Sequence, residues 1–186
     1  MGQNYDGGCA EYVLVPFGAM AALPDGIPFE QAALIPDAVA TPYSGLIHRG
    51  RLRLGEVVGL WGIGGLGTHA VQIARLARAA LIIAVDPLDQ AVSCLGRYGR
   101  AVIIGMCLEP VQLTEPSVML GYMNHAVKGH DGYEPRDIAQ LMRLVASGRL
   151  DLSRSVSHVV PLEDVARGVD RLRTKEGNPV RIVVKP

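Results

Sequence analysis

A glycine triplet between an apolar strand and an amphipathic helix constrains the fold of this 186-residue chain more than any other feature. Residues 57–61 (VVGLW) are almost all apolar, as in a parallel strand that is buried on both faces. They run directly into G-x-G-x-x-G at residues 62–67, and residues 70–77 then repeat small or apolar side chains at helical spacing. The sequence therefore predicts a strand, a tight turn and a helix in immediate succession.

Each glycine of this triplet has a predicted mechanical role. Gly62 permits the tight turn, Gly64 lets backbone approach a pyrophosphate without an intervening Cβ, and Gly67 lets helix and strand pack closely. The N-terminus of the helix then offers free N–H groups and a partial positive charge to the phosphates. The residues predicted to bind the dinucleotide here are Gly62, Ile63, Gly64, Gly65, Leu66 and Gly67.

Asp86 completes the dinucleotide pattern at the end of the next apolar run, residues 81–85. It lies 19 residues after Gly67, where a carboxylate can bind the hydroxyls of the adenosine ribose. No arginine stands beside it to hold a 2′-phosphate, so the pattern favours NAD over NADP. The alternative is that the glycines serve packing alone, because glycine turns also occur without a ligand.

The order of predicted elements indicates an α/β fold with a Rossmann-type parallel sheet. Strands at 57–61, 81–85 and 101–105 alternate with helical segments, which is the pattern of right-handed parallel crossovers. A strand is also predicted at 10–16, and Asp37 is placed to cap a helix that runs to about His48. Further strands are predicted at 126–129 and 180–184, and helices follow Pro135 and Leu162.

Composition excludes several classes of function. The 18 basic residues balance the 18 acidic ones, so no basic excess is available to bind nucleic acid. The longest apolar run, residues 79–85, is far shorter than the roughly 20 residues of a membrane span. The start of the chain does not resemble a signal peptide, and the three cysteines are isolated. We therefore expect a cytoplasmic protein without membrane or nucleic-acid partners.

Five segments together resemble the zinc-dependent medium-chain alcohol dehydrogenases. They are residues 7–12 (GGCAEY), 23–26 (LPDG), 37–43 (DAVATPY), 62–67 (GIGGLG) and 177–184 (GNPVRIVV). The resemblance implies a GroES-like catalytic domain, a Rossmann coenzyme domain and hydride transfer between NAD and an alcohol, aldehyde or ketone. It divides the chain into a remnant of the catalytic domain at 1–36, an NAD-binding Rossmann domain at 37–131, and residues 132–186, which return to the catalytic domain.

The same resemblance implies roles for individual residues. Asp37 matches the third ligand of the catalytic zinc, and Thr41 lies near the nicotinamide. Gly105 and Met106 border the nicotinamide pocket, and Arg181 reaches the coenzyme phosphates. Residues 126–130 match a strand that pairs across the family's dimer, so a homo-oligomer is implied. The alternatives are a helix N-cap for Asp37, helix packing for Thr41 and a solvated strand position for Arg181.

Two departures from the family limit what the resemblance implies. The sequence starts just before residues 7–12, and of the zinc ligands only Asp37 has a match, whereas a catalytic zinc needs three protein ligands. We therefore expect that zinc is not retained, and no catalytic residue is assigned. Only 14 residues, 87–100, separate the second strand from the third, which indicates an internal block removed near residues 89–90. The retained strands then either close up or leave an open edge that is prone to self-association.

Four hypotheses follow. The first is an alcohol-dehydrogenase-like oxidoreductase that is inactive on its own, and the second is a catalytically silent module for NAD binding or oligomerisation. The third is a fragment without a function, and the fourth is a zinc-free enzyme that resembles the quinone reductases. A carboxylate at position 37 disfavours the last, because an enzyme without zinc has no use for it there.

Overall fold

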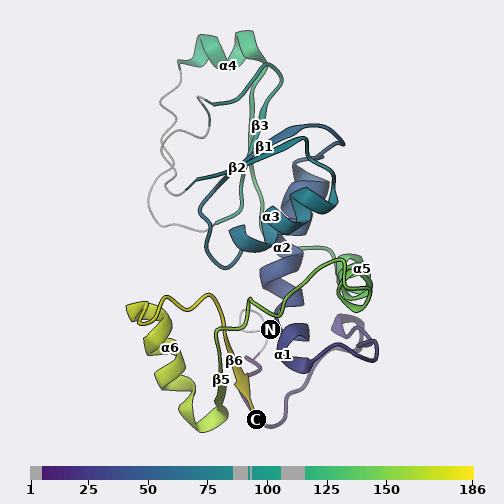
Figure 1. Cartoon of the computed structure of the whole chain (residues 1–186), viewed down its shortest axis with the longest axis vertical. Coiled ribbons are helices and arrows are strands. Elements are labelled where there is room, and N and C mark those ends of the chain that lie inside the picture. The colour runs from purple at the N-terminus through teal and green to yellow at the C-terminus, as the bar shows by residue number, and fades with distance from the viewer. Residues whose placement is uncertain (1–5, 86–91, 93, 106–115) are drawn as a thin grey trace. The chain divides into compact units, whose positions relative to one another are not determined.

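The computed structural model describes residues 6–85, 92, 94–105 and 116–186, and it divides the chain into two compact units (Figure 1). Unit 1 comprises residues 1–36 and 138–186, and unit 2 comprises residues 37–137. The assignment of these units to a catalytic and a coenzyme domain stays a prediction.

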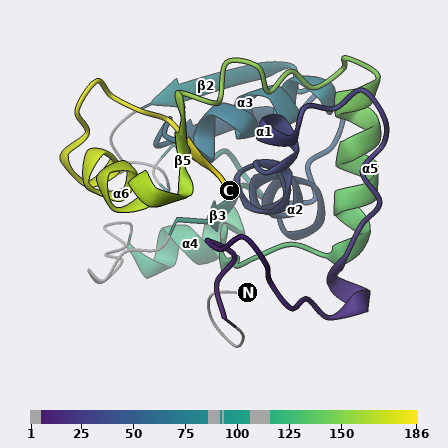
Figure 2. The same cartoon turned by 90° about the horizontal axis from the view of Figure 1, so that it is seen from below.

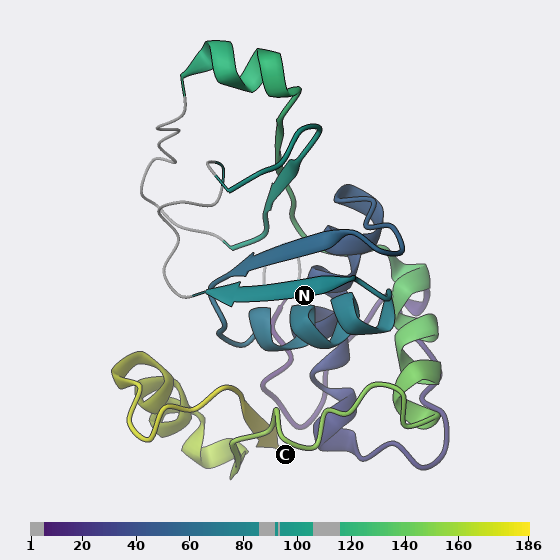
Figure 3. The same ribbon diagram turned by 45° about the horizontal axis from the view of Figure 1, so that its top comes forward.

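The strand, glycine turn and helix predicted from the sequence form the core of unit 2. Strand β1 (Val57–Trp61) pairs in parallel with β2 (Leu81–Val85), and helix α3 (Gly67–Leu76) connects them. Figure 3 shows α3 lying along one face of this pair. The buried residues of that contact are small on the helix and branched on the strand, which allows close packing; they are Val58, Leu60, Ala70 and Ala74.

A second strand pair lies in the same unit but is not joined to the first. Strand β3 (Arg100–Ile103) pairs in parallel with β4 (Ala126–Gly129), and α4 (Ser117–Met123) precedes β4. Within the described residues, no ladder hydrogen bonds join β1 or β2 to β3 or β4, and Figure 3 shows the two pairs running in different directions. The α/β fold with parallel strands is therefore confirmed, and the described strands are paired two by two.

One ion pair connects the starts of the two strand pairs. The Arg100 guanidinium, at the first residue of β3, donates from Nη2 to Oε2 of Glu56 at 2.6 Å and from Nε to the carbonyl oxygen of Gly50, also at 2.6 Å. Burial raises the pKa of Glu56, but the hydrogen bonds from Arg100 and from the Arg53 N–H, with the charges of both arginines, hold it below the ordinary value. This contact fixes where β3 starts relative to β1.

The face of the β1–β2 pair that points away from α3 is apolar and exposed; we call it the outer face. Val57, Leu81 and Ile83 lie on it with 62%, 52% and 47% of their surface accessible. Trp61 is on the same face, and its ring lies over Gly59, where an added Cβ would come within 2.3 Å of the ring. A doubly wound sheet normally covers both of its faces, whereas among the described residues only the face toward α3 is covered.

A helical segment runs from Ile35 to Arg49 before β1. It consists of the π-helical turn η2 (Ile35–Val39), helix α2 (Ala40–Ser44) and a second π-helical turn, η3 (Gly45–Arg49). Every residue of α2 is buried. Gly45 allows close packing, because a Cβ there would lie 2.5 Å from the Cδ1 of Ile104, which follows β3.

Unit 1 contains a third parallel pair, β5 (His158–Pro161) with β6 (Ile182–Lys185). Helix α6 (Val165–Thr174) packs against this pair through Gly168, and Figure 2 shows α6 beside β5. The same unit contains the 3-10 turn η4 (Leu162–Asp164), the short α1 (Phe29–Ala32) and the 3-10 turn η1 (Phe17–Ala19). Helix α5 (Pro135–Ala146) starts in unit 2 and continues in unit 1 from Ile138. The buried core includes Leu141, Leu150 and Leu152.

Several elements differ from their predictions. The segment 10–16 forms no strand, and Tyr12 and Leu14 are 91% and 96% exposed, because no described strand lies beside it to accept its hydrogen bonds. The C-terminal strand starts two residues later than predicted, at Ile182. Helix α4 and strand β5 were not predicted. Among the described residues, no helix is both long and apolar enough to cross a membrane.

Candidate functional site

The glycine turn at residues 62–67 contains the three glycines of the motif, Gly62, Gly64 and Gly67, in three different environments. Gly62 has φ of +86°, a conformation that side chains rarely adopt. A Cβ at Gly67 would lie 2.0 Å from the carbonyl oxygen of Gly62, so the first and last glycines are in close contact. At Gly64, by contrast, a Cβ would meet no heavy atom within 4 Å. The loop thus closes on itself and leaves open space in front of its centre.

Two side chains from the first turn of α3 bind the carbonyl groups of this loop. Oγ1 of Thr68 donates to the carbonyl oxygen of Gly64 at 2.6 Å, and Nδ1 of His69 lies 2.7 Å from the carbonyl oxygen of Gly65. His69 has no accessible surface. The sequence patterns did not single out either residue.

Asp37 and Thr41 lie together on the helical segment before β1. Asp37 does not cap a helix, because it lies inside η2 and the N-terminal position of α2 is Val39 without a side-chain cap. Its Oδ1 instead accepts a hydrogen bond from Oγ1 of Thr41, one helical turn later, at 3.2 Å. Burial raises the pKa of Tyr133, and the Asp37 charge raises it further. Thr41, with 6% exposure, also accepts a bond from Nε2 of His130 through its carbonyl oxygen at 3.2 Å.

A buried carboxylate in unit 2, that of Asp137, is paired with a histidine. Oδ1 of Asp137 lies 2.9 Å from Nε2 of His48, and its Oδ2 accepts the backbone N–H of Glu134. Asp137 is 2% exposed, and Tyr43 meets the His48 ring edge to face. The sequence motifs assigned no functional role to His48 or Asp137. An acidic residue at the third position of a helix that starts with proline was the available signal for the contact with Glu134.

The residues present do not fit a zinc site in the part of the chain that the structure describes. No group of three or more histidine, cysteine, aspartate or glutamate side chains gathers there. Asp37 matches one ligand position by sequence, and its described partner is the Thr41 hydroxyl. A catalytic zinc requires three protein ligands, so we derive no chemistry through a metal.

The other predicted site residues do not all lie in the unit that contains the glycine loop. Gly105 is an exposed bend just after β3, in the same unit as the glycine loop, Asp37 and Thr41. Arg181 lies in unit 1, beside β6, where its carbonyl oxygen accepts the N–H of Ser157 at 2.8 Å. Asp86 and Met106 fall outside the described residues. Unit 2 thus brings together the glycine loop and the helical segment of Asp37 and Thr41.

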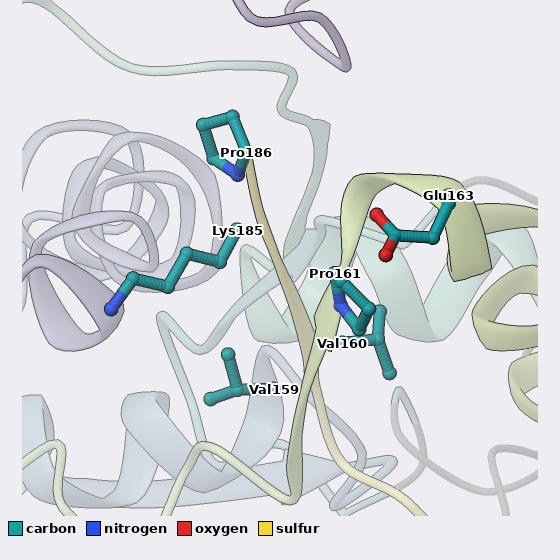
Figure 4. A pocket seen from close by; sticks show the side chains of 6 residues that line it. All are labelled: Val159, Val160, Pro161, Glu163, Lys185 and Pro186. Atoms are coloured by element: carbon teal, nitrogen blue, oxygen red, sulfur yellow. The ribbon is translucent and has the colours of Figure 1, made fainter.

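A hollow of about 450 Å³ lies in unit 1 at the ends of β5 and β6 (Figure 4). Its lining is mixed and contains none of the predicted site residues; it consists of Val159, Val160, Pro161, Glu163, Lys185 and Pro186. The Lys185 ammonium group lies 3.7 Å from a carboxylate oxygen of Glu30. The hollow lacks the convergent polar groups that typify a small-molecule site.

Comparison with known proteins finds relatives along the whole chain, although no family model matches. An alcohol dehydrogenase of Cupriavidus necator is 24% identical over 238 positions, which cover 100% of this chain and 64% of that protein. The chain therefore spans about two thirds of the length of this relative. Since the chain has 186 residues, the alignment leaves 52 positions, 238 minus 186, without a counterpart inside it.

Solved structures that resemble this chain include alcohol dehydrogenases as well. A thermostable alcohol dehydrogenase from Pyrobaculum aerophilum, with cobalt and zinc bound, has a TM-score of 0.77 and 25% identity and covers 97% of this chain and 64% of its own. An alcohol dehydrogenase from Escherichia coli, complexed with NADH, has a TM-score of 0.85 at 13% identity and covers 97% and 66%. The resemblance to zinc-dependent medium-chain alcohol dehydrogenases is therefore confirmed, together with an α/β fold of short parallel strand pairs.

Proposed function

We propose that this chain binds NAD at residues 62–67 and derives from an oxidoreductase of the alcohol dehydrogenase type. The open space in front of Gly64, at the N-terminus of α3, carries this proposal. A diphosphate needs to come within hydrogen-bond distance of backbone N–H groups, and a side chain at this position would prevent that approach. Gly62 and Gly67 keep the loop in the conformation that exposes those groups.

The proposed reaction of the family type is hydride transfer between NAD and a small alcohol, aldehyde or ketone. When bound, NAD would supply the hydride acceptor or donor at its nicotinamide ring. Within this chain, the loop amides would hold the pyrophosphate, and Thr41 and Gly105 are the described candidates for the nicotinamide side. Asp86, Met106 and Arg181 remain candidates from the sequence. We further propose a cytoplasmic location.

We expect coenzyme binding without turnover by this chain alone. Asp37 is the sole match to a zinc ligand that the sequence offers, and its carboxylate is engaged by Thr41. The second candidate function is therefore a catalytically silent module that binds NAD and associates with other subunits. The exposed apolar outer face of the β1–β2 pair favours such an association.

Calorimetric titration with NAD and NADH tests the proposal, and Trp61 gives an independent optical signal. Trp61 is the single tryptophan and directly precedes Gly62, so bound NADH is expected to quench its emission. Saturable binding without oxidation of a panel of alcohols would support the silent module. Turnover by the purified chain would instead support an active dehydrogenase. Absence of both heat and fluorescence change would rule out the coenzyme site.

A further inference from the structure

Two carbonyl groups of the glycine loop, those of Gly64 and Gly65, are bound by side chains from the first turn of α3. The carbonyl oxygen of Gly64 accepts two hydrogen bonds from Thr68, one from the backbone N–H at 3.0 Å and one from Oγ1 at 2.6 Å. The carbonyl oxygen of Gly65 lies 2.7 Å from Nδ1 of His69. Both side chains thus reach back four residues to the loop.

These bonds determine where the loop's amide groups point. In a trans peptide, the N–H is directed opposite to the preceding C=O. Because Thr68 draws the Gly64 carbonyl toward the helix, the Gly65 N–H of the same peptide points away from the helix. The bond between Gly65 and His69 orients the Leu66 N–H in the same way. Two donors are therefore aimed outward from the N-terminus of α3.

The contact of His69 also defines the state of its ring. A carbonyl oxygen can only accept, so Nδ1 carries a hydrogen and donates it to Gly65. The side chain is completely buried, in the first turn of a helix that packs against β1 through Ala70 and Ala74. It is held more rigidly than a surface side chain, and it restrains the peptide that it binds.

We propose that Thr68 and His69 are positioning residues that preorganise the Gly65 and Leu66 amide groups for the pyrophosphate of NAD. The inference rests on the proposed function and adds to it the residues that set the affinity of the loop for a diphosphate. Without these side-chain bonds, the Gly64 carbonyl would keep only the bond from the Thr68 N–H, so the two peptides would be less restrained and binding would have to order them further. Neither side chain touches the ligand in this proposal; each acts through a loop carbonyl.

The Thr68→Val variant tests the proposal, because valine keeps the branched shape and removes only the hydroxyl group. A net contribution of about 1 kcal/mol per hydrogen bond corresponds to a loss of about fivefold in affinity for ADP-ribose. Thr68→Ser retains the hydroxyl group and is expected to restore the affinity to within about twofold of the wild type. Titration calorimetry with ADP-ribose gives both affinities, and thermal unfolding shows whether each variant is folded.

Adenosine separates positioning from a general loss of structure. It lacks phosphate, so its affinity, measured by competition, is expected to be the same in the wild type and in Thr68→Val. If adenosine and ADP-ribose weaken together, the residue is merely structural and the proposal is wrong. The same conclusion follows if Thr68→Val binds ADP-ribose as the wild type does, or if Thr68→Ser fails to restore binding.

His69 provides a second pair of variants. His69→Asn keeps an N–H donor near the position of Nδ1, whereas His69→Leu removes it. We expect His69→Asn to bind ADP-ribose more tightly than His69→Leu, and equal affinities in two folded variants would contradict the role of His69. A wild-type chain that binds no ADP-ribose would refute the proposed function itself, which is a different result from an unaffected variant.

Discussion

Alanine at each of the three motif glycines, Gly62, Gly64 and Gly67, should produce three different results. At Gly64, the added methyl group meets no atom within 4 Å, so the folded protein can accept it without a clash. The same methyl group occupies the space through which a phosphate oxygen would approach the loop amides. Weakening one hydrogen bond to a charged group costs about 1.5–3 kcal/mol, which corresponds to about 10- to 150-fold in affinity. We therefore expect Gly64→Ala to fold normally and to bind NAD at least tenfold more weakly.

Gly67→Ala is the matched control, and its expected effects are reversed. Its Cβ would lie 2.0 Å from the Gly62 carbonyl oxygen and 3.0 Å from the carbonyl carbon, and both are backbone atoms. The backbone shifts that accommodate such an added methyl group cost about 1–3 kcal/mol of folding free energy. For a chain of 186 residues, each kcal/mol lowers the melting temperature by about 2–4 °C. The loss of stability in Gly62→Ala should lie between those of the other two variants, because a side chain at φ of +86° costs about 1–2 kcal/mol.

Thermal unfolding and calorimetric titration of the three variants provide the comparison. The decisive result is a separation of the two properties: Gly64→Ala loses affinity at constant melting temperature, and Gly67→Ala loses stability. If Gly64→Ala retains the affinity of the wild type, the space in front of the loop is not where the phosphates bind. If Gly67→Ala melts as the wild type does, the close contact between the first and last glycines is not present in solution.

Three further predictions concern the ion pairs and the outer face of unit 2. Glu56→Gln should lower the free energy of unfolding by about 1 kcal/mol at neutral pH. Because folding lowers the pKa of Glu56 from 4.5, this difference between the variant and the wild type should disappear as the pH falls through the folded pKa. Urea unfolding at several pH values can check this. His48→Ala leaves the buried Asp137 without its histidine partner and should cost about 1–3 kcal/mol in thermal unfolding, whereas an unchanged stability would mean that the pair contributes nothing. Replacement of Ile83 by lysine adds charge to the outer face and should shift sedimentation toward the monomer; unchanged sedimentation would show that this face does not associate.

The elements that could be predicted from the sequence are those whose own residues determine them. Strand β1 and helix α3 occur where the apolar run and the helical repeat place them, because both are packed against each other locally. The segment 10–16 has the composition of a strand but lacks a described partner, and composition alone cannot supply one. Whether the strand pairs join into one sheet depends on residues that lie between them. The 52 alignment positions that have no counterpart in this chain are relevant here, and their location near residues 89–90 stays a prediction.

The candidate site likewise contains some features that the sequence predicts and others that it does not. The positive φ of Gly62 and the open space at Gly64 match the mechanical roles that the motif predicts for these residues. The alternative role of Asp37 as a helix N-cap is wrong, because the helical segment starts at Ile35 and continues through Asp37. The bonds from Thr68 and His69 to the loop depend on side-chain rotamers, which no spacing rule specifies.

The indole ring of Trp61, the chain's one tryptophan, packs over the α-carbon of Gly59, and this position is open to the ring only because residue 59 has no side chain. Even a methyl group at that position would push the ring outward, and the emission spectrum would shift to the red as water reached it. Engineering at position 59 therefore offers a way to tune an intrinsic fluorophore at the entrance to the loop without changing the loop itself.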